Sequence, residues 1–145
     1  MRTDGPIERF PVFPTFCWWP SGDDGCVSPT VLVVDDDPAF RQLATRLLDA
    51  VGLFVVGEAG TVAAALATAE RLKPSAALID VELPDGDGIA LARVLAALPW
   101  HPRVVLTSVN GDSTTADEAK KAGAQAFVFK AGLPDAPLAR LLGGE

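Results

Sequence analysis

Four short apolar runs in this chain each end at a polar residue, and this pattern constrains the fold more than any other feature. The runs cover residues 31–34, 76–79, 104–106 and 127–129, and the residues that follow them are Asp35, Asp80, Thr107 and Lys130. Short, continuously apolar runs are typical of strands that are buried on both faces of a parallel sheet. Because ligands of an open parallel sheet bind beyond the carboxyl ends of its strands, we expect these polar residues to share one crevice.

Segments with helical spacing alternate with these strands, and residues 54–56 supply one more strand. Asp37 is placed to cap a first helix that Pro38 opens and Gly52 ends. Further helices are predicted over residues 62–72, 91–98, 112–122 and 138–142. In the fourth helix, Thr114 and Asp117 have capping-box spacing, and a thin apolar stripe (Ala116, Ala119 and Ala122) indicates loose packing. Five strands that alternate with five helices predict an α/β fold with helices on both faces of a parallel sheet.

Composition sets the broad class of protein. A chain of 145 residues with 49% hydrophobic residues is long and apolar enough for one folded domain. It has no apolar run of membrane-spanning length and no secretion signal at its start, so we expect no membrane partner and a cytoplasmic location. Its net charge of −7 argues against direct binding of nucleic acid.

Residues 1–29 differ from the regular pattern of residues 30–145, and we treat them as an irregular N-terminal leader. Prolines and aromatic residues alternate in this leader, which favours irregular backbone. A docking tail, a flexible leader packed on the domain and a later translation start at Val27 are its alternative interpretations; we favour a leader that is nonessential or not translated. Cys17 and Cys26 are interpreted as free thiols, because His101 is the single histidine and a zinc site lacks ligands.

The acids Asp35, Asp36 and Asp80 indicate the chemistry of the crevice. Two carboxylates about 4 Å apart repel each other by roughly 4 kcal/mol at an effective dielectric constant of 20, so such a cluster requires a neutralising charge. Mg²⁺ prefers this kind of oxygen ligand, and beside it an aspartate oxygen can attack phosphorus to form an acyl phosphate. Lys130 would supply a positive charge and Thr107 a hydroxyl donor for the transferred oxygens. Each of these residues alone has an ordinary structural explanation. Their occurrence at successive strand ends favours a functional site instead.

From about residue 31 to residue 142 the sequence resembles the receiver domain of two-component response regulators. The stretches that carry the resemblance are Val31–Pro38, Ile79–Gly88, Val105–Ser108 and Ala122–Lys130. The resemblance implies a flavodoxin-like, CheY-like sheet with strand order 2-1-3-4-5.

The same resemblance implies a role for each matching residue. Asp80 would accept the phosphoryl group, with Mg²⁺ bound by Asp36, Asp80 and the backbone carbonyl of Glu82, and with Asp35 assisting through water. Thr107 and Lys130 would contact the phosphoryl group. Phe127 would be the aromatic residue that moves inward when Thr107 turns toward the phosphate, which shifts a two-state equilibrium at the fourth helix, fifth strand and fifth helix.

Two positions depart from the family pattern. Ala131 follows the lysine, where family members often carry a proline, so the loop after Lys130 is expected to differ. Glu82 places a side-chain carboxylate near the acceptor, which is predicted to alter the lifetime of the phosphoryl group.

These observations favour a stand-alone receiver, a phosphoprotein of a phosphorelay rather than a turnover enzyme. Its phosphoryl donor would be a histidine kinase or a histidine phosphotransfer protein, its target is an unknown protein, and a phosphorylation-dependent dimer is left open. Two alternatives remain. One is a small phosphohydrolase of the haloacid-dehalogenase type with Asp35 as nucleophile, and the other is a receiver-like binding module that acts without phosphorylation.

Overall fold

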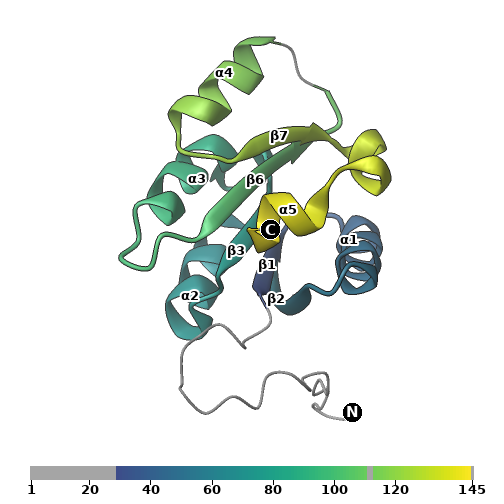
Figure 1. Cartoon of the computed structure of the whole chain (residues 1–145). Helices are drawn as coiled ribbons and strands as arrows, with labels where there is room; N and C mark the ends of the chain where they lie inside the picture. The colour runs from purple at the N-terminus through teal and green to yellow at the C-terminus, as the bar shows by residue number, and fades with distance from the viewer. Residues whose placement is uncertain (1–28, 111–112, 145) are drawn as a thin grey trace.

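The computed structural model of the chain describes residues 29–110 and 113–144. Five strands form one parallel sheet, namely β1 (Thr30–Val34), β2 (Phe54–Ala59), β3 (Ala76–Asp80), β6 (Arg103–Ser108) and β7 (Ala126–Phe129). Their order across the sheet is β2-β1-β3-β6-β7 (Figure 1). Counted along the chain as five strands, this is the predicted order 2-1-3-4-5. The predictions for the N-terminal leader, with Cys17 and Cys26, lie outside the described residues.

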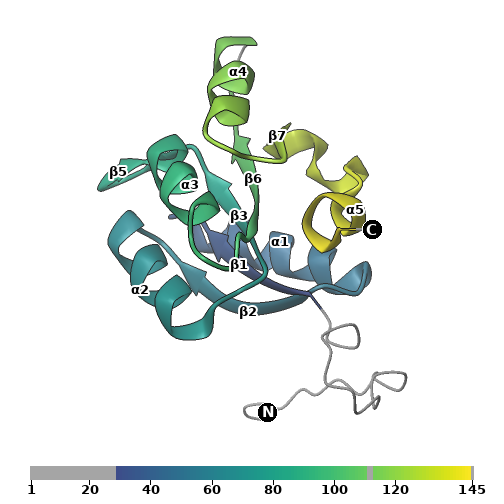
Figure 2. The same ribbon diagram turned by 60° about the vertical axis from the view of Figure 1, so that its left-hand side comes forward.

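Helices cover both faces of this sheet, as predicted. They are α1 (Pro38–Ala50), α2 (Val62–Leu72), α3 (Gly88–Ala96), α4 (Ser113–Lys121) and α5 (Leu138–Gly143). Figure 2 shows α2 and α3 on one side of the sheet and α1 and α5 on the other. In the part of the chain that the structure describes, no helix has the length and apolar character needed to cross a bilayer.

Alternation along the strands divides the core into two layers. Leu32 and Val34 of β1 pack with residues of α2, α3 and α4, whereas Val31 and Val33 pack with α1 and α5. Because successive side chains of a strand point to opposite faces, a strand between two helical layers must be apolar at every position. This explains why the sequence shows continuous apolar runs rather than alternating ones.

The predicted ends of α1 are confirmed. The Asp37 side chain accepts a hydrogen bond from the Ala39 N–H at 3.0 Å, and Pro38 is the first helical residue. Gly52 follows the helix with a φ of +87°, a backbone conformation that glycine adopts without steric cost. The signals at the start of the helix therefore determine the turn that connects Asp35 and Asp36 to α1.

The fourth helix departs from its prediction in two ways. It begins at Ser113, so Thr114 lies inside the helix and is not its N-cap residue. Ala116 is exposed, whereas Ala119 and Ala122 are buried. The apolar stripe is therefore even thinner than predicted, because of its three alanines only Ala119 and Ala122 pack in the core.

Two short elements near the carboxyl edge of the sheet were not predicted. Strands β4 (Glu82–Leu83) and β5 (Gly86–Asp87) form an antiparallel hairpin after Asp80, and a 3₁₀ helix, η3 (Lys130–Asp135), follows β7. Two-residue strands are too short to show a period in the sequence. Both elements carry predicted site residues, Glu82 and Lys130, so they matter for the geometry of the site.

Candidate functional site

The register of the sheet brings the predicted site residues together. Val34 of β1 pairs with Ile79 of β3, so Asp35 and Asp80 follow as neighbours at the carboxyl edge. Asp80 is itself paired with Thr107 on β6. Three adjacent strands thus deliver two carboxylates and a hydroxyl to one end of the sheet.

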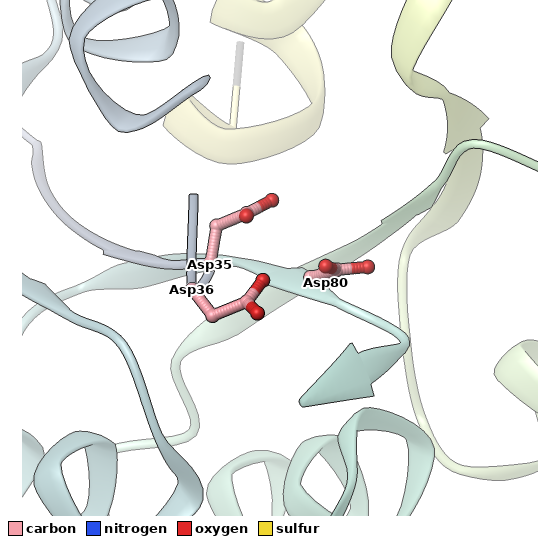
Figure 3. A group of neighbouring side chains, drawn as sticks. All are labelled: Asp35, Asp36 and Asp80. Carbon is pink, nitrogen blue, oxygen red and sulfur yellow. The ribbon is translucent and has the colours of Figure 1, made fainter. Parts of the chain in front are cut away.

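The three predicted acids form a cluster. Asp35, Asp36 and Asp80 each offer one carboxylate oxygen, and these oxygens lie within 4.8 Å of one another (Figure 3). Asp35 is fully buried, Asp80 is 6% exposed, and Asp36 is open to solvent. Backbone N–H groups orient two of the acids, because Asp37 donates to Asp35 Oδ1 at 2.8 Å and Glu82 donates to Asp80 Oδ1 at 3.2 Å.

Lys130 reaches this cluster from the start of η3. Its Nζ lies 2.6 Å from Asp35 Oδ2 and 3.3 Å from Asp80 Oδ2. It also lies 4.5 Å from the centre of the Phe40 ring, close enough for a cation–π interaction. Burial lowers the pKa of Lys130, but contact with Asp35 and the charges of both acids outweigh it and raise the pKa above its ordinary value. The amine therefore stays protonated between two carboxylates.

Asp80 differs from an ordinary surface carboxyl group. Burial raises its pKa, and the negative charge of Asp35 raises it further, whereas the Glu82 N–H and Lys130 act in the opposite direction. A carboxylate that is partly desolvated gains more from a nearby cation than a fully hydrated one does. Asp80 is thus a buried acid whose charge the surrounding groups compensate only in part.

The donor set fits a hard divalent cation. Asp35 Oδ2 is buried, and within the described residues its charge is met by a single ion pair, with the Lys130 ammonium group 2.6 Å away. Three ionised carboxylates and one ammonium group leave two negative charges, which one divalent cation would balance. Carboxylate oxygens together with solvent access at Asp36 suit Mg²⁺, which keeps several waters when it is bound.

The predicted switch residues Thr107 and Phe127 lie on β6 and β7, the two strands that follow β3 across the sheet. Thr107 is fully buried, and its hydroxyl donates to the Ile79 carbonyl at 3.4 Å, a long hydrogen bond that would be released at little cost. Phe127 is half-buried, and its ring meets that of Phe129 edge-to-face at 5.3 Å. The Glu82 side chain is exposed. Thr107 and Glu82 thus lie at the predicted carboxyl edge of the sheet, whereas Phe127 lies earlier along β7, where it pairs with Leu106. The movements and ligand roles of these residues stay predictions.

Sequence reasoning missed two residues that support the site from α1. Arg41 donates from Nη1 to the Asp35 carbonyl at 2.6 Å, while its Nε pairs with Glu58 at 2.9 Å. Phe40 lies beneath the Lys130 amine. Phe40 has the apolar character of any core residue of a helix, and an arginine one turn into a helix carries no sequence signal for a contact with the backbone of a preceding loop.

The fold and the site define the class of protein: a doubly wound α/β domain with an acidic crevice and a lysine at the carboxyl edge of its sheet. Residues 31–141 match the family model described as the response regulator receiver domain, and the chain belongs to this family. The predicted family and fold are therefore confirmed. The chain is a receiver domain of the two-component response regulators.

Individual relatives agree with this assignment. The chain is similar to the DNA-binding transcriptional activator DevR/DosR of Mycobacterium tuberculosis, with 43% identity over 102 residues that make up 69% of this chain and 46% of the relative. It is 37% identical to a protein-glutamate methylesterase/protein-glutamine glutaminase of Myxococcus xanthus over 74% of this chain and 31% of that protein. The chain thus spans about half, or less, of the length of these curated relatives.

A solved structure shows the same fold. A CheY-like response regulator receiver domain protein from Methanospirillum hungatei JF-1 superimposes with a TM-score of 0.71 and 25% identity, over 81% of this chain and 94% of that one. Receiver domains therefore occur both in transcriptional regulators and in enzymes. The predictions that this chain is no turnover enzyme, stands alone and binds no nucleic acid stay predictions.

Proposed function

We propose that the chain is a phosphoryl-accepting receiver in which Asp80 is the acceptor. The observation that carries this proposal is the position of the Lys130 amine between Asp35 and Asp80, beside an exposed Asp36. Asp80 is buried and has a raised pKa, and its Oδ1 is oriented by the Glu82 N–H. An aspartate held this way presents one oxygen in a defined direction for attack.

The transfer step balances without a further reactant. An Asp80 oxygen forms a bond to phosphorus while the bond from phosphorus to the donor breaks, and the donor leaves as imidazole from a phosphohistidine or as acetate from acetyl phosphate. Mg²⁺, held by Asp36, Asp80 and the Glu82 carbonyl with Asp35 acting through water, would supply positive charge for the phosphoryl oxygens. Lys130 then pairs with one transferred oxygen, and Thr107 turns from the Ile79 carbonyl to donate to another.

The phosphoryl donor is a histidine kinase or a histidine phosphotransfer protein, and the output is a changed surface for a protein target. The buried hydroxyl of Thr107 and the half-buried ring of Phe127 lie on neighbouring strands, which supports a coupled movement. Neither a change at this surface nor a dimer requires turnover of a substrate. The chain is therefore proposed to signal rather than to catalyse a metabolic reaction.

Incubation with acetyl phosphate and Mg²⁺ tests the proposal. The wild-type chain should gain one phosphoryl group, seen by intact mass and removed by hydroxylamine, and Asp80→Asn should abolish it. Asp135→Asn, an exposed acid of η3, is the matched control and should leave phosphorylation intact. Steady hydrolysis of phosphate esters that is lost in Asp35→Asn would instead support a phosphohydrolase. A chain that gains no phosphoryl group from any donor would support a phosphorylation-independent binding module.

A further inference from the structure

The carboxylate of Asp85 connects the acceptor loop to a neighbouring helix. Asp85 lies in the turn of the β4–β5 hairpin, and its Oδ1 accepts a hydrogen bond from the Val62 N–H at 2.7 Å. Its Oδ2 accepts a second one from the Ala63 N–H at 3.1 Å. These two N–H groups open α2, so one side chain joins the hairpin to the helix with two hydrogen bonds.

The beginning of α2 is built to receive this carboxylate. The first N–H groups of a helix have no partner within the helix. Thr61, the N-cap residue, accepts from the Ala64 N–H at 3.0 Å but leaves those of Val62 and Ala63 unsatisfied. Asp85 satisfies both, and its negative charge lies at the positive end of the helix dipole. Hydrogen bonding from Val62 accordingly lowers the pKa of Asp85, so the carboxylate is charged at neutral pH.

The β4–β5 hairpin connects the anchored Asp85 to the acid cluster. Glu82 pairs with Asp87 and Leu83 pairs with Gly86 across its two strands. Glu82 is also the residue whose N–H orients Asp80 Oδ1. A side chain at Gly86 would meet Val62 Cγ2 at 3.1 Å, which shows how closely the hairpin lies against α2. The position of Glu82 at the acid cluster therefore depends on where the turn is anchored.

We propose that Asp85 is a positioning residue, which holds the Glu82 carbonyl at the metal site by fastening the β4–β5 hairpin to the first turn of α2. The inference rests on the proposed function, because it takes the Glu82 carbonyl as a ligand of Mg²⁺. By this proposal, helix α2 affects the affinity for the metal although it supplies no metal ligand of its own. Outer residues that support metal ligands commonly change affinity at least tenfold when they are removed.

The test compares Mg²⁺ binding in two variants that each remove a cap of the same helix. Asp85→Ala removes the anchor, and we expect the dissociation constant for Mg²⁺, measured by calorimetric titration, to rise by roughly tenfold. Thr61→Ala removes a cap whose hydrogen bond is made to α2 itself, and its Mg²⁺ affinity should match that of the wild-type chain. Asp85→Asn keeps an oxygen for one of the two N–H groups and should fall between them. Circular dichroism melts of all variants show how far each cap contributes to folding.

An NMR titration supplies the readout that a purely structural role would not move. In the wild-type chain the Glu82 and Leu83 amide signals should shift together upon addition of Mg²⁺, and in Asp85→Ala this shift should require more metal. Equal affinity in Asp85→Ala and the wild-type chain, or an equal loss in Thr61→Ala, would overturn the inference while leaving the proposed function intact. A wild-type chain that binds no Mg²⁺ would overturn both.

Discussion

Lys130 is the residue on which the charge balance of the site depends. Its amine lies 2.6 Å from the fully buried Asp35 and 3.3 Å from Asp80. Removing one partner of a buried ion pair leaves an uncompensated charge, which commonly costs about 3 kcal/mol or more. Lys130→Met should therefore lower the free energy of unfolding by about 3 kcal/mol at pH 7 without Mg²⁺, as measured by urea denaturation.

Lys120→Met is the matched control for this substitution, because Lys120 is exposed on α4. It should change the free energy of unfolding by no more than about 0.5 kcal/mol. Equal effects of the two substitutions would contradict the view that the ammonium group compensates the buried acids. Addition of Mg²⁺ should stabilise Lys130→Met by more than it stabilises the wild-type chain or Lys120→Met, since a cation at the acids takes over the role of the missing ammonium group.

Asp80 gives the site a dependence on pH. Its raised pKa means that the folded chain binds this proton more tightly than the unfolded chain, whose ordinary pKa is 3.8. The stability gained from protonated Asp80 is fully present below pH 3.8 and is lost as the pH rises through the raised pKa. Asp80→Asn, which cannot ionise, should thus be more stable than the wild-type chain at pH 7 in EDTA.

Urea denaturation across the acidic range checks this sign. The advantage of Asp80→Asn should shrink as the pH falls toward 3.8, because the wild-type carboxyl group then becomes neutral in both states. Asp135→Asn, at an exposed position, should show no such trend. An advantage that grows toward acid would mean that Asp80 is stabilised as a carboxylate.

At the scale of elements, the loop after β3 depends on Gly88. A Cβ atom at this position would lie 2.0 Å from the Asp80 carbonyl oxygen and 2.8 Å from Val81 Cα. Backbone atoms cannot move aside as the end of a side chain can, so Gly88→Ala should cost about 3 kcal/mol of stability and reduce phosphorylation of Asp80. Urea denaturation and the acetyl phosphate reaction measure the two effects.

Gly132 offers the control within η3. A Cβ atom there would meet nothing within 4 Å. Gly132→Ala should be neutral, or should stabilise the chain by about 0.5 kcal/mol through the unfolded state. A Gly88→Ala variant as stable as Gly132→Ala would show that the loop can relax around the added carbon.

The elements also show what the sequence could predict and why. The five central strands and the caps of α1 were predictable, because continuous apolar runs and an Asp–Pro start are local signals. The acid cluster followed from them, since parallel strands end at one edge. The β4–β5 hairpin was not predicted, although Leu83–Pro84–Asp85–Gly86 has the composition of a tight turn.

Contacts between distant segments could not be read from spacing. Asp85 caps a helix that begins 23 residues before it, and Arg41 donates to a carbonyl in the preceding loop. No local pattern marks either partner, because each contact exists only once the helices have packed. The prediction that Ala116 belongs to the apolar stripe of α4 failed for a related reason, since helical spacing alone did not show that Ala116 would be exposed.

For the whole molecule, the site and the fold are linked through charge. The chain has a net charge of −7, and its three clustered acids with Lys130 contribute two of these negative charges at one edge of the sheet. The remaining net charge lies outside this cluster, and salt screens charges that are exposed to solvent. A divalent cation should therefore stabilise the chain in two ways, by general screening and by binding to folded molecules only.

The two contributions can be separated by a thermal melt. Saturation of the site at one hundred times its dissociation constant adds about 2.7 kcal/mol to the free energy of unfolding. MgCl₂ should thus raise the Tm well beyond NaCl of the same ionic strength. Asp36→Ala should abolish that difference but keep the response to NaCl, because Asp36 is exposed and its loss costs little stability in itself. Equal shifts in the two salts for the wild-type chain would show that Mg²⁺ acts only by screening and that the acid cluster holds no cation.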